Sequence, residues 1–407
     1  MASTPLTLAA LATSAVPGLH VLGARIHSGD GEGDFAAVVV VAEEGEFIVR
    51  VPANAAAEAR QSGELMGLAA LAEGARSSLP FRVPETRGVT RAGDTRAVVS
   101  TFLSGGRVSV ESLEADALLL QPVAETVAAI HALPASLVQQ AGLPVRSAEE
   151  VREQASRLVA RAAETRLLPE TVHTHWETLL GTAALWDFAP TVVHGSFSAE
   201  QLLVEDESVT GVLGWSELSV GDPAIDLSWL LAAGPDVLDS VLTRYAVRRG
   251  LGGFRELRAR AVFHHELEVA RWLLHGVESH DSAIVEDGVA MLDRLVDRLN
   301  RSGGATPLRP ALSDEEVRQL LDEMPEVPAD PRSETAEFEA LDEDREFFAD
   351  TDFLDPVPES ASASADPAES TPDAAEEGDS ELADAHLTDV QLTEPIEPLE
   401  SGDAADR

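Results

Sequence analysis

This 407-residue chain lacks both cysteine and lysine. Without cysteine there is no disulfide framework and no thiolate metal site. All 29 basic residues are arginine, so no lysine can anchor the phosphates of a nucleotide. Aromatic residues make up only 4%, but the apolar fraction of 44% is enough for a sizeable core, and the length leaves room for two or three structural units.

Positive charge is also scarce, and the deficit is unevenly placed. The whole chain has a net charge of −43. The residues after Ala305 contribute −27 of this, because they contain 32 acidic residues and only five arginines, and the residues up to Ala305 contribute −16. Binding of nucleic acid depends on basic residues that release counterions from the phosphates. We therefore expect no direct nucleic-acid partner.

Long hydrophobic runs are absent. No segment reaches the roughly 18 apolar residues that a membrane-spanning helix needs, so no membrane association is expected. The first 22 residues contain neither lysine nor arginine, which argues against a secretory signal. A cytoplasmic location is the resulting expectation.

The chain is organised around residues 191–231, where short apolar runs alternate with polar turns. Three short strands are predicted there, from apolar runs at 192–193, 202–204 and 209–213. Gly221-Asp222-Pro223 then breaks the chain, and we expect a helix over 224–231 with the proline near its first turn. Short strands that hold polar loops side by side are a common scaffold for chemistry, so functional residues are expected here.

This stretch resembles the aminoglycoside and macrolide phosphotransferase family, which has a protein-kinase-like fold. The family pattern is His-Gly-Asp, four residues, Asn, an apolar pair, an apolar-Asp-aromatic step and Gly-Asp-Pro-x-x-Asp-Leu. The positions that fit it in register are His194-Gly195, Leu202-Leu203, Gly211–Leu213, Trp215 and Gly221–Leu227. The last segment, which contains Asp222 and Asp226, is most similar to the macrolide branch.

Three positions depart from the family pattern. The proton-accepting aspartate of the family falls on Ser196, its metal-binding asparagine on Gln201, and its second metal ligand, an aspartate, on Gly214. Phosphoryl transfer relies on a carboxylate near the acceptor hydroxyl and on oxygen ligands for the metal ions. Loss of a general base alone typically lowers the rate on the order of 10²–10⁴-fold, and loss of a metal carboxylate adds to that. The departures predict a protein whose ordinary catalysis is impaired.

Another acid that reached the same place would preserve some activity. Glu200 and Glu217 lie close in sequence to the substituted positions. His194, by contrast, is interpreted as a hydrogen-bonded structural residue rather than a base. Two interpretations therefore remain: loss of ordinary catalysis, and residual activity that uses a different acid.

The resemblance continues toward the N-terminus. Strands are expected over 20–26, 35–42, 46–51, 81–84 and 97–103. The glycine-rich loop between the first two strands, with Gly31 and Gly33, implies a roof over nucleotide phosphates. Because Asp30, Glu32 and Asp34 make this loop anionic, a plain hairpin turn is an equal alternative.

Arg50 lies where the family has a basic residue at the end of its third strand. Arginine is a fork-shaped donor that can hold phosphate, so a nucleotide site is not excluded. Glu58 or Glu64, on a helix expected over 55–71, is placed to pair with Arg50. The alternative is a surface arginine beside an exposed helix glutamate.

The expected architecture is α+β and two-lobed. Residues 1–103 form a small β-rich N-lobe, Ser104–Gly106 a hinge, and residues 104–304 a mainly helical C-lobe. Helices are expected over 148–166 and 170–186, with further apolar stripes at 119–130, 263–274 and 285–299. Neither the pair His173 and His175 nor His264-His265-Glu266 has the spacing of a metal site.

Residues 305–407 form an acidic tail outside the family pattern. Most of the tail has too few large apolar groups to offset its chain entropy, so disorder is expected. The segment 334–354 mixes acids with phenylalanines, a composition that favours docking to a protein partner. A solubilising tail is the alternative.

Three functions remain open. The first is a pseudo-phosphotransferase that acts as a binding or scaffold module. The second is an active phosphotransferase that uses ATP or GTP with Mg²⁺ on a hydroxyl of a small macrolide- or aminoglycoside-like molecule. The third retains the nucleotide pocket for another transfer or for sensing. The substituted motif positions favour the first function. A protein with that function requires neither a nucleotide nor a metal cofactor.

Overall fold

The computed structural model describes residues 4–27, 33–115 and 117–301. By its internal contacts the chain divides into Met1–Leu341 and Asp342–Arg407. The second unit lies outside the described residues, and so does the segment 334–354 that is expected to bind a partner.

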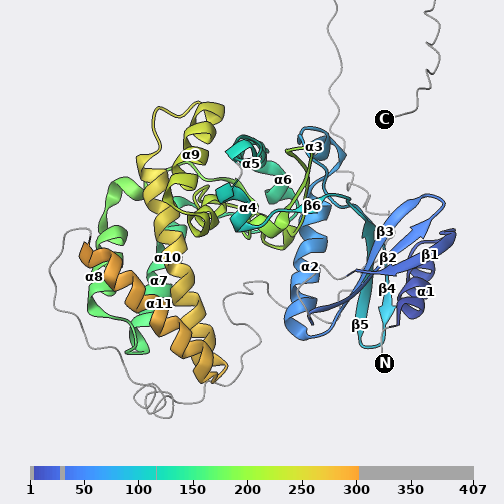
Figure 1. The fold of residues 1–407 in the computed structure, drawn as a ribbon, viewed down its shortest axis with the longest axis horizontal. Coiled ribbons are helices and arrows are strands. Elements are labelled where there is room, and N and C mark those ends of the chain that lie inside the picture. Colours follow the sequence, from blue (N-terminus) through green and yellow to red (C-terminus); the bar gives the residue numbers. More distant parts are fainter. Residues whose placement is uncertain (1–3, 28–32, 116, 302–407) are drawn as a thin grey trace, which may run out of the picture. The chain divides into compact units, whose positions relative to one another are not determined.

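The N-terminal part is a five-stranded antiparallel sheet with strand order β1-β2-β3-β5-β4 (Figure 1). Its strands are β1 (Val21–Ile26), β2 (Phe35–Ala42), β3 (Gly45–Pro52), β4 (Thr86–Ala92) and β5 (Thr95–Thr101). Val38, Val39 and Val40 are all fully buried, so the β2 strand is covered on both faces. One face packs against α1 (Pro5–Ala15), whose Leu8, Ala9 and Ala12 join the core of the sheet.

One expected strand in this lobe is wrong, and two elements of the structure were not expected. The strand expected over 81–84 is a single bridge between Arg82 and Gly211, because the prolines on either side have no N–H to donate to a ladder. The actual strand, β4, is mostly exposed and has no continuous apolar run to reveal it. The helix α1 also has no counterpart in the sequence interpretation.

Helix α2 (Ala55–Ala70) lies between the sheet and the helical part of the chain (Figure 1). Asn54 caps it by accepting a hydrogen bond from the backbone N–H of Ala57 at 2.8 Å. Gly63 and Gly67 let its backbone approach the turn at 215–217 closely: a Cβ on Gly67 would lie 3.1 Å from the carbonyl carbon of Trp215, with the oxygen still nearer. The small residues on α2 therefore allow this helix to pack closely against the turn at 215–217 of the C-terminal part.

The C-terminal part is mainly helical, as expected. Its long helices are α5 (Leu120–His131), α7 (Ala148–Glu164), α8 (Glu170–Gly181), α9 (Pro235–Arg249), α10 (Arg255–Glu278) and α11 (Ser282–Arg301). Its shorter helices and 3₁₀ turns are α4 (Val110–Ala115), α6 (Ser136–Gln140), η1 (Ala117–Leu119), η2 (Ala183–Trp186), η3 (Ala199–Gln201) and η4 (Trp215–Glu217). The short helix α3 (Glu73–Ser77) belongs to the N-terminal part, between α2 and β4. The segment expected as a helix over 224–231 is a 3₁₀ helix, η5 (Ile225–Ala233).

Two small sheets hold the central motif. The strands β7 (Thr191–Val193) and β10 (Ser219–Gly221) form one pair, and β6 (Gly106–Arg107), β8 (Leu202–Glu205) and β9 (Ser208–Val212) form a three-stranded sheet. The expected hinge glycine, Gly106, thus begins a strand that pairs with β8. Trp215, Leu202 and Val212 lie in the larger apolar core, while α7, α8, α10 and α11 share a second one.

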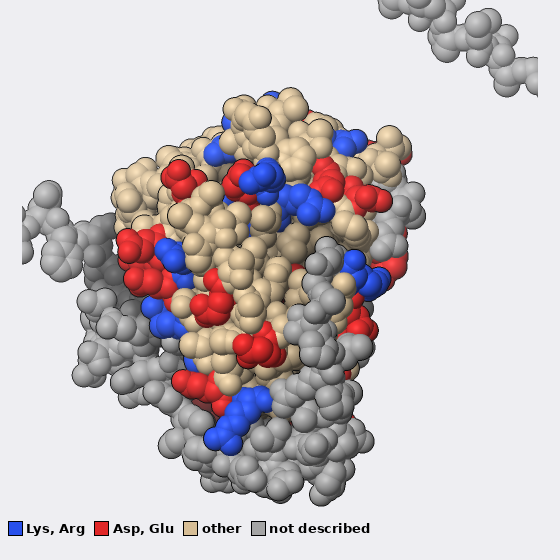
Figure 2. Space-filling model, turned by 90° about the vertical axis from the view of Figure 1, so that its left-hand side faces the viewer, with Lys and Arg blue, Asp and Glu red and all other residues tan. Residues whose placement is uncertain are grey.

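The predicted α+β class, with a β-rich N-terminal lobe and a helical C-terminal lobe, is confirmed. In the part of the chain that the structure describes, no helix is long and apolar enough to cross a bilayer. On the face drawn in Figure 2, arginine and acidic side chains are interspersed rather than gathered into one basic surface.

Candidate functional site

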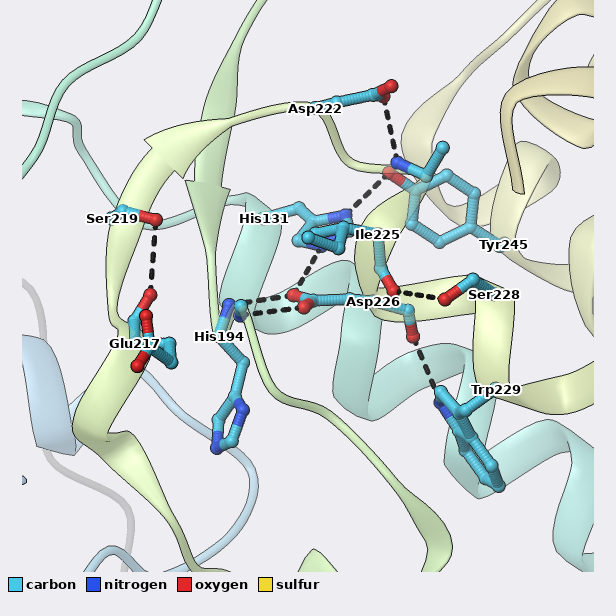
Figure 3. Close-up of polar contacts among 12 residues, drawn as sticks. His131, His194, Glu217, Ser219, Asp222, Ile225, Asp226, Ser228, Trp229 and Tyr245 are labelled. Carbon is cyan, nitrogen blue, oxygen red and sulfur yellow. Dashed lines mark hydrogen bonds and ion pairs between the residues drawn. The ribbon is translucent and has the colours of Figure 1, made fainter. Parts of the chain in front are cut away.

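Asp226, on η5, holds the loop that carries the central motif. Its carboxylate accepts hydrogen bonds from two successive backbone N–H groups, those of His194 at 2.7 Å and Gly195 at 2.8 Å (Figure 3). Gly195 has a φ of +85°, and a Cβ there would lie 2.8 Å from the Cβ of Glu217. The loop therefore depends on a glycine at 195 and on the carboxylate that bridges its two N–H groups.

A buried chain of polar groups supports Asp226 from behind. The Nε2–H of His131 donates to Asp226 at 3.0 Å, and the Tyr245 hydroxyl donates to Nδ1 of His131 at 2.8 Å. Burial by itself raises the pKa of Asp226, but the hydrogen bonds from His131 and from the His194 backbone hold it below its ordinary value. Burial raises the pKa of Tyr245 to about 12, which keeps its hydroxyl protonated as a donor.

The ring of His194 points away from Asp226 (Figure 3). Its Nε2–H donates to the carbonyl oxygen of Leu213 at 2.8 Å, and the ring packs against Phe197 and Trp215. Burial lowers the pKa of His194, although the charge of Asp226 opposes this, so the ring is neutral near pH 7. In this geometry the His194 ring connects the loop at 194–196 to the loop at 213–214 by a hydrogen bond.

Asp222 is occupied by a second buried network. Its carboxylate accepts hydrogen bonds from Arg260 Nε at 2.9 and 3.0 Å, from His264 Nε2 at 3.0 Å and from the backbone N–H of Ala224 at 2.9 Å. Burial alone raises the pKa of Asp222, but His264 and Arg260 lower it below its ordinary value. With its oxygens shared among these donors, Asp222 fixes β10 and η5 against α10.

The three substituted motif positions lie together. The hydroxyl of Ser196, which is exposed, donates to the carbonyl oxygen of Gly214 at 3.2 Å. The Gln201 side chain packs against Gly214, because a Cβ there would lie 2.6 Å from Cδ of Gln201, with Oε1 nearer still. Gly214 also has a φ of +78°. The amide of Gln201 thus fills the space that a side chain at 214 would enter.

These residues do not fit a magnesium ion. Mg²⁺ requires near-octahedral oxygen ligands and is usually bound by one or two carboxylates. At the two family metal positions the chain offers only the Gln201 amide, and that group is packed on the Gly214 backbone. Across the residues that the structure describes, no group of three or more histidine and acidic side chains is arranged to hold a metal.

On the N-lobe side of the site, Arg50 on β3 forms an ion pair with Glu64 on α2, and Glu58 is not its partner. Both side chains are largely shielded from water, and the guanidinium also lies 5.4 Å from the centre of the Phe35 ring. Gly33 adopts a φ of +108° at the end of the loop before β2. Gly31 lies outside the described residues, so the predicted phosphate roof stays a prediction.

A cavity of about 360 Å³ adjoins the motif loop on the side of α7 and α10. Its floor includes Gly195, Glu217, Ser219 and Asp222, and its walls carry apolar side chains from both helices. A cavity of this size matches the lower range of small-molecule sites. The position beside residues 195–196 is where the family resemblance implies an acceptor.

Glu217 and Glu200, the two acids considered as substitutes, separate in the structure. Both side chains are exposed to solvent, but Glu217 lines the cavity and Glu200, on η3, does not. Solvent reaches Glu217 through the cavity, but the surrounding protein removes part of its hydration and raises its pKa, which the charge of Arg146 partly offsets. Of the two acids, Glu217 is thus the one that the fold brings to the cavity.

The histidine pairs do not converge on one another. His173 lies 3.9 Å from Glu177 on its own helix, while His175 lies 3.2 Å from Glu266 on α10.

Sequence reasoning also missed the partners of the motif aspartates. Arg260 is 38 residues from Asp222 and His131 is 95 residues from Asp226, and no local spacing signals such pairs.

The fold and this motif geometry define a kinase-like protein with an aspartate-held loop beside a small-molecule-sized cavity. The model of the phosphotransferase enzyme family matches residues 26–261, more than half of the chain. The chain belongs to this family.

Relatives and solved structures agree with that assignment. Viomycin phosphotransferase from Streptomyces vinaceus is 30% identical over 244 residues, which cover 56% of this chain and 79% of that protein. Among solved structures, the macrolide 2'-phosphotransferase MphH from Brachybacterium faecium has a TM-score of 0.59 at 24% identity, covering 71% of this chain and 98% of that chain. The GDP complex of aminoglycoside 2'-phosphotransferase-IIIa has a TM-score of 0.60 at 18% identity, covering 74% and 100%. The structural likenesses support the fold.

Proposed function

We propose that this family member binds a small molecule but has lost ordinary magnesium-dependent phosphoryl transfer, and so acts as a binding or scaffold module. The carrying observation is the Gln201 amide packed against Gly214. It takes the space that a metal-binding carboxylate at 214 would need. Ser196 adds to this, because a neutral hydroxyl that already donates to Gly214 cannot orient an acceptor as a carboxylate does.

The features that would bind a ligand are retained. The Asp226 bridge keeps the loop at 194–195 in place, and the cavity beside it is large enough for part of a drug-sized molecule. A binding module needs only these, since binding does not require that the bound molecule react. The predicted partner segment at 334–354 stays a prediction beside this proposal.

A second candidate is an active phosphotransferase that uses ATP or GTP. It is favoured by the Arg50–Glu64 pair and by the relative that is named a viomycin phosphotransferase. In that case Arg50, held by Glu64, would contact the phosphates of the nucleotide. The acceptor would then be a hydroxyl-bearing antibiotic-like molecule.

A thermal-shift titration with ATP and GTP, each with and without Mg²⁺, separates the two candidates. A ligand that binds only the folded state raises its stability by RT ln(1 + [L]/Kd), about 2.7 kcal/mol at 100 times Kd. The proposal expects no stabilisation that depends on Mg²⁺. A Mg²⁺-dependent shift in the unaltered protein, together with release of ADP or GDP in the presence of an acceptor, would overturn it.

The triple variant Ser196→Asp, Gln201→Asn, Gly214→Asp provides the matched gain-of-function control. It restores the family residue at each departing position at once. We expect it to acquire Mg²⁺-dependent nucleotide binding that the parent lacks. Equal responses in parent and variant would show that these three positions do not form the metal and base site.

A further inference from the structure

The C-terminal end of helix α9 is rich in positive charge, although the chain as a whole is acidic. From Asp239 to Arg258 there are five arginines and only two acids. Asp239 pairs with Arg258, and Glu256 pairs with its neighbour Arg255. Arg248 is exposed, and among the described residues its guanidinium has no hydrogen-bond or ion-pair partner. This part of the surface therefore carries positive charge that the neighbouring acids do not balance.

Two apolar side chains are exposed at the same place. Val247 is 81% exposed and Leu251 is 43% exposed. Gly250 ends α9 with a φ of +65°, and the backbone N–H of Leu251 donates to the carbonyl oxygen of Ala246 at 2.9 Å. This turn keeps Leu251 beside the last turn of the helix. We use the name α9-end surface for four exposed residues: Val247, Arg248, Leu251 and Arg255.

The chemistry of the α9-end surface favours an acidic segment that also carries apolar side chains. A single exposed ion pair contributes little to binding, because water and salt screen it. Contact with Val247 and Leu251 adds the burial of apolar surface, which salt does not weaken. A purely anionic partner would leave these two side chains in water.

The chain itself contains such a segment, 11 residues beyond the end of α11 at Arg301. Residues 312–324 (LSDEEVRQLLDEM) have five acids and one arginine, together with five large apolar residues. Their net charge of −4 is opposite to that of the α9-end surface. The segment lies outside the described residues.

The point where α11 ends puts the α9-end surface within reach. Burial and the charge of Arg298 lower the pKa of His265, so the last turn of α11 lies beside the middle of α10. From His265 back to Arg255 is ten residues of helix, about 15 Å. Ten residues, 302–311, precede the segment, and a random coil of that length has an r.m.s. span of about 16–19 Å. A tether that matches its span gives the highest effective concentration.

We propose that residues 312–324 dock on the α9-end surface of their own chain, with apolar side chains against Val247 and Leu251 and acids beside Arg248 and Arg255. The inference goes beyond the proposed function and does not depend on it. Docking within one chain is favoured over docking on a second copy. A short tether gives an effective concentration in the millimolar range, far above that of a second copy in a dilute solution.

The test measures distances between two spin labels in the full-length protein. Because the chain has no cysteine, the variants Thr243→Cys and Ser313→Cys together provide the only two labelling sites. Thr243 is exposed on α9, four residues before Val247, and Ser313 lies in the segment. Double electron–electron resonance should give a narrow distance distribution if the segment is docked and a broad one if it is not.

Arg248→Glu and Arg152→Glu form a matched pair of charge reversals in the doubly labelled protein. Arg152 is an exposed arginine on α7, outside the α9-end surface. We expect the narrow distribution in the labelled parent and in Arg152→Glu. In Arg248→Glu the ratio of docked to undocked molecules should fall about threefold to tenfold, and 1 M NaCl should lower the same ratio in the parent. The Tm of each variant shows that it is folded.

Three results would overturn the proposal. A broad distribution in the labelled parent would show that the segment does not dock. Equal ratios in Arg248→Glu and Arg152→Glu would show that it docks elsewhere. The same narrow distance in a mixture of singly labelled proteins, one with each cysteine, would assign the segment to a second copy. None of these measurements involves a nucleotide or a small molecule, so their outcome is independent of the proposed function.

Discussion

A Cβ at position 214 is the most direct probe of the altered metal site. Gly214→Ala adds one methyl group and no charge. Two effects should lower the free energy of unfolding. A non-glycine residue in the left-handed region costs about 1–2 kcal/mol. In addition, the new Cβ would lie 2.6 Å from Cδ of Gln201, so that side chain must move. Because the contact is with the flexible end of the Gln201 side chain, which can turn aside, the second penalty is expected to be only about 0.5–1.5 kcal/mol.

Gly250 supplies the control for the first penalty. It ends α9 with a φ of +65°, close to the +78° of Gly214, and a Cβ there would meet nothing within 4 Å. Gly250→Ala should therefore lose only the backbone contribution of about 1–2 kcal/mol. The excess in Gly214→Ala measures the contact with Gln201.

Removal of the Gln201 side chain should abolish that excess. In a Gln201→Ala background, Gly214→Ala should destabilise about as much as Gly250→Ala does. The double-mutant cycle should thus give a coupling energy of about 0.5–1.5 kcal/mol between positions 201 and 214, in the lower part of the range that contacting residues show. Urea denaturation of the four proteins measures the cycle, and Tm should follow at about 2–4 °C per kcal/mol.

The cycle can also refute the argument for a closed metal site. If Gly214→Ala destabilises equally with and without the Gln201 side chain, the amide does not occupy the space at 214. The proposal that the family metal position has been packed shut would then be wrong. Such a cycle energy near zero would assign the whole penalty of Gly214→Ala to the backbone.

Three further predictions concern buried or partly buried charges. Asp226→Ala leaves two backbone N–H groups and His131 without their acceptor. Urea denaturation should therefore show that the free energy of unfolding falls by about 3–5 kcal/mol. A decrease of less than about 1 kcal/mol would contradict the bridging role of Asp226. Arg260→Met should be similarly destabilising because it removes a cation from buried Asp222, and adding Asp222→Asn should recover part of the loss. Since burial raises the pKa of Glu217 above 4.5, the folded state binds its proton more tightly, and this group's contribution to stability falls as pH rises from 4.5 through the raised value. Glu217→Gln should therefore gain stability over the unaltered protein at neutral pH but not below pH 4.5, and Tm curves of equal pH dependence would contradict this.

The sequence interpretation was most accurate where local pattern is strong. The strand β2 was expected at its observed bounds, because a run of valines between turn residues has few alternatives. The stripes on α10 and α11 were visible for the same reason, since a helix buries every third or fourth residue. The strand β4 was missed because its exposed, threonine- and arginine-containing sequence carries no such pattern.

The candidate site shows the same division. The register of the motif identified the positions of Ser196, Gln201 and Gly214, and the structure places all three together. Asp222 and Asp226 were both recognised as motif residues, but their different surroundings were not. One is held by an arginine and a histidine of α10 and the other serves the backbone of a loop.

The amino-acid sequence by itself determined the family, the two-lobed α+β class and the loss of three motif side chains, because each of these follows from residue identity and from spacing along the chain. The tertiary structure alone decided that Gln201 fills the space at Gly214, and that Glu217 rather than Glu200 faces the cavity. Such contacts join residues from separate turns, strands and helices. Their distances depend on how glycines such as Gly67 and Gly195 let backbones approach, which no periodicity of the sequence records.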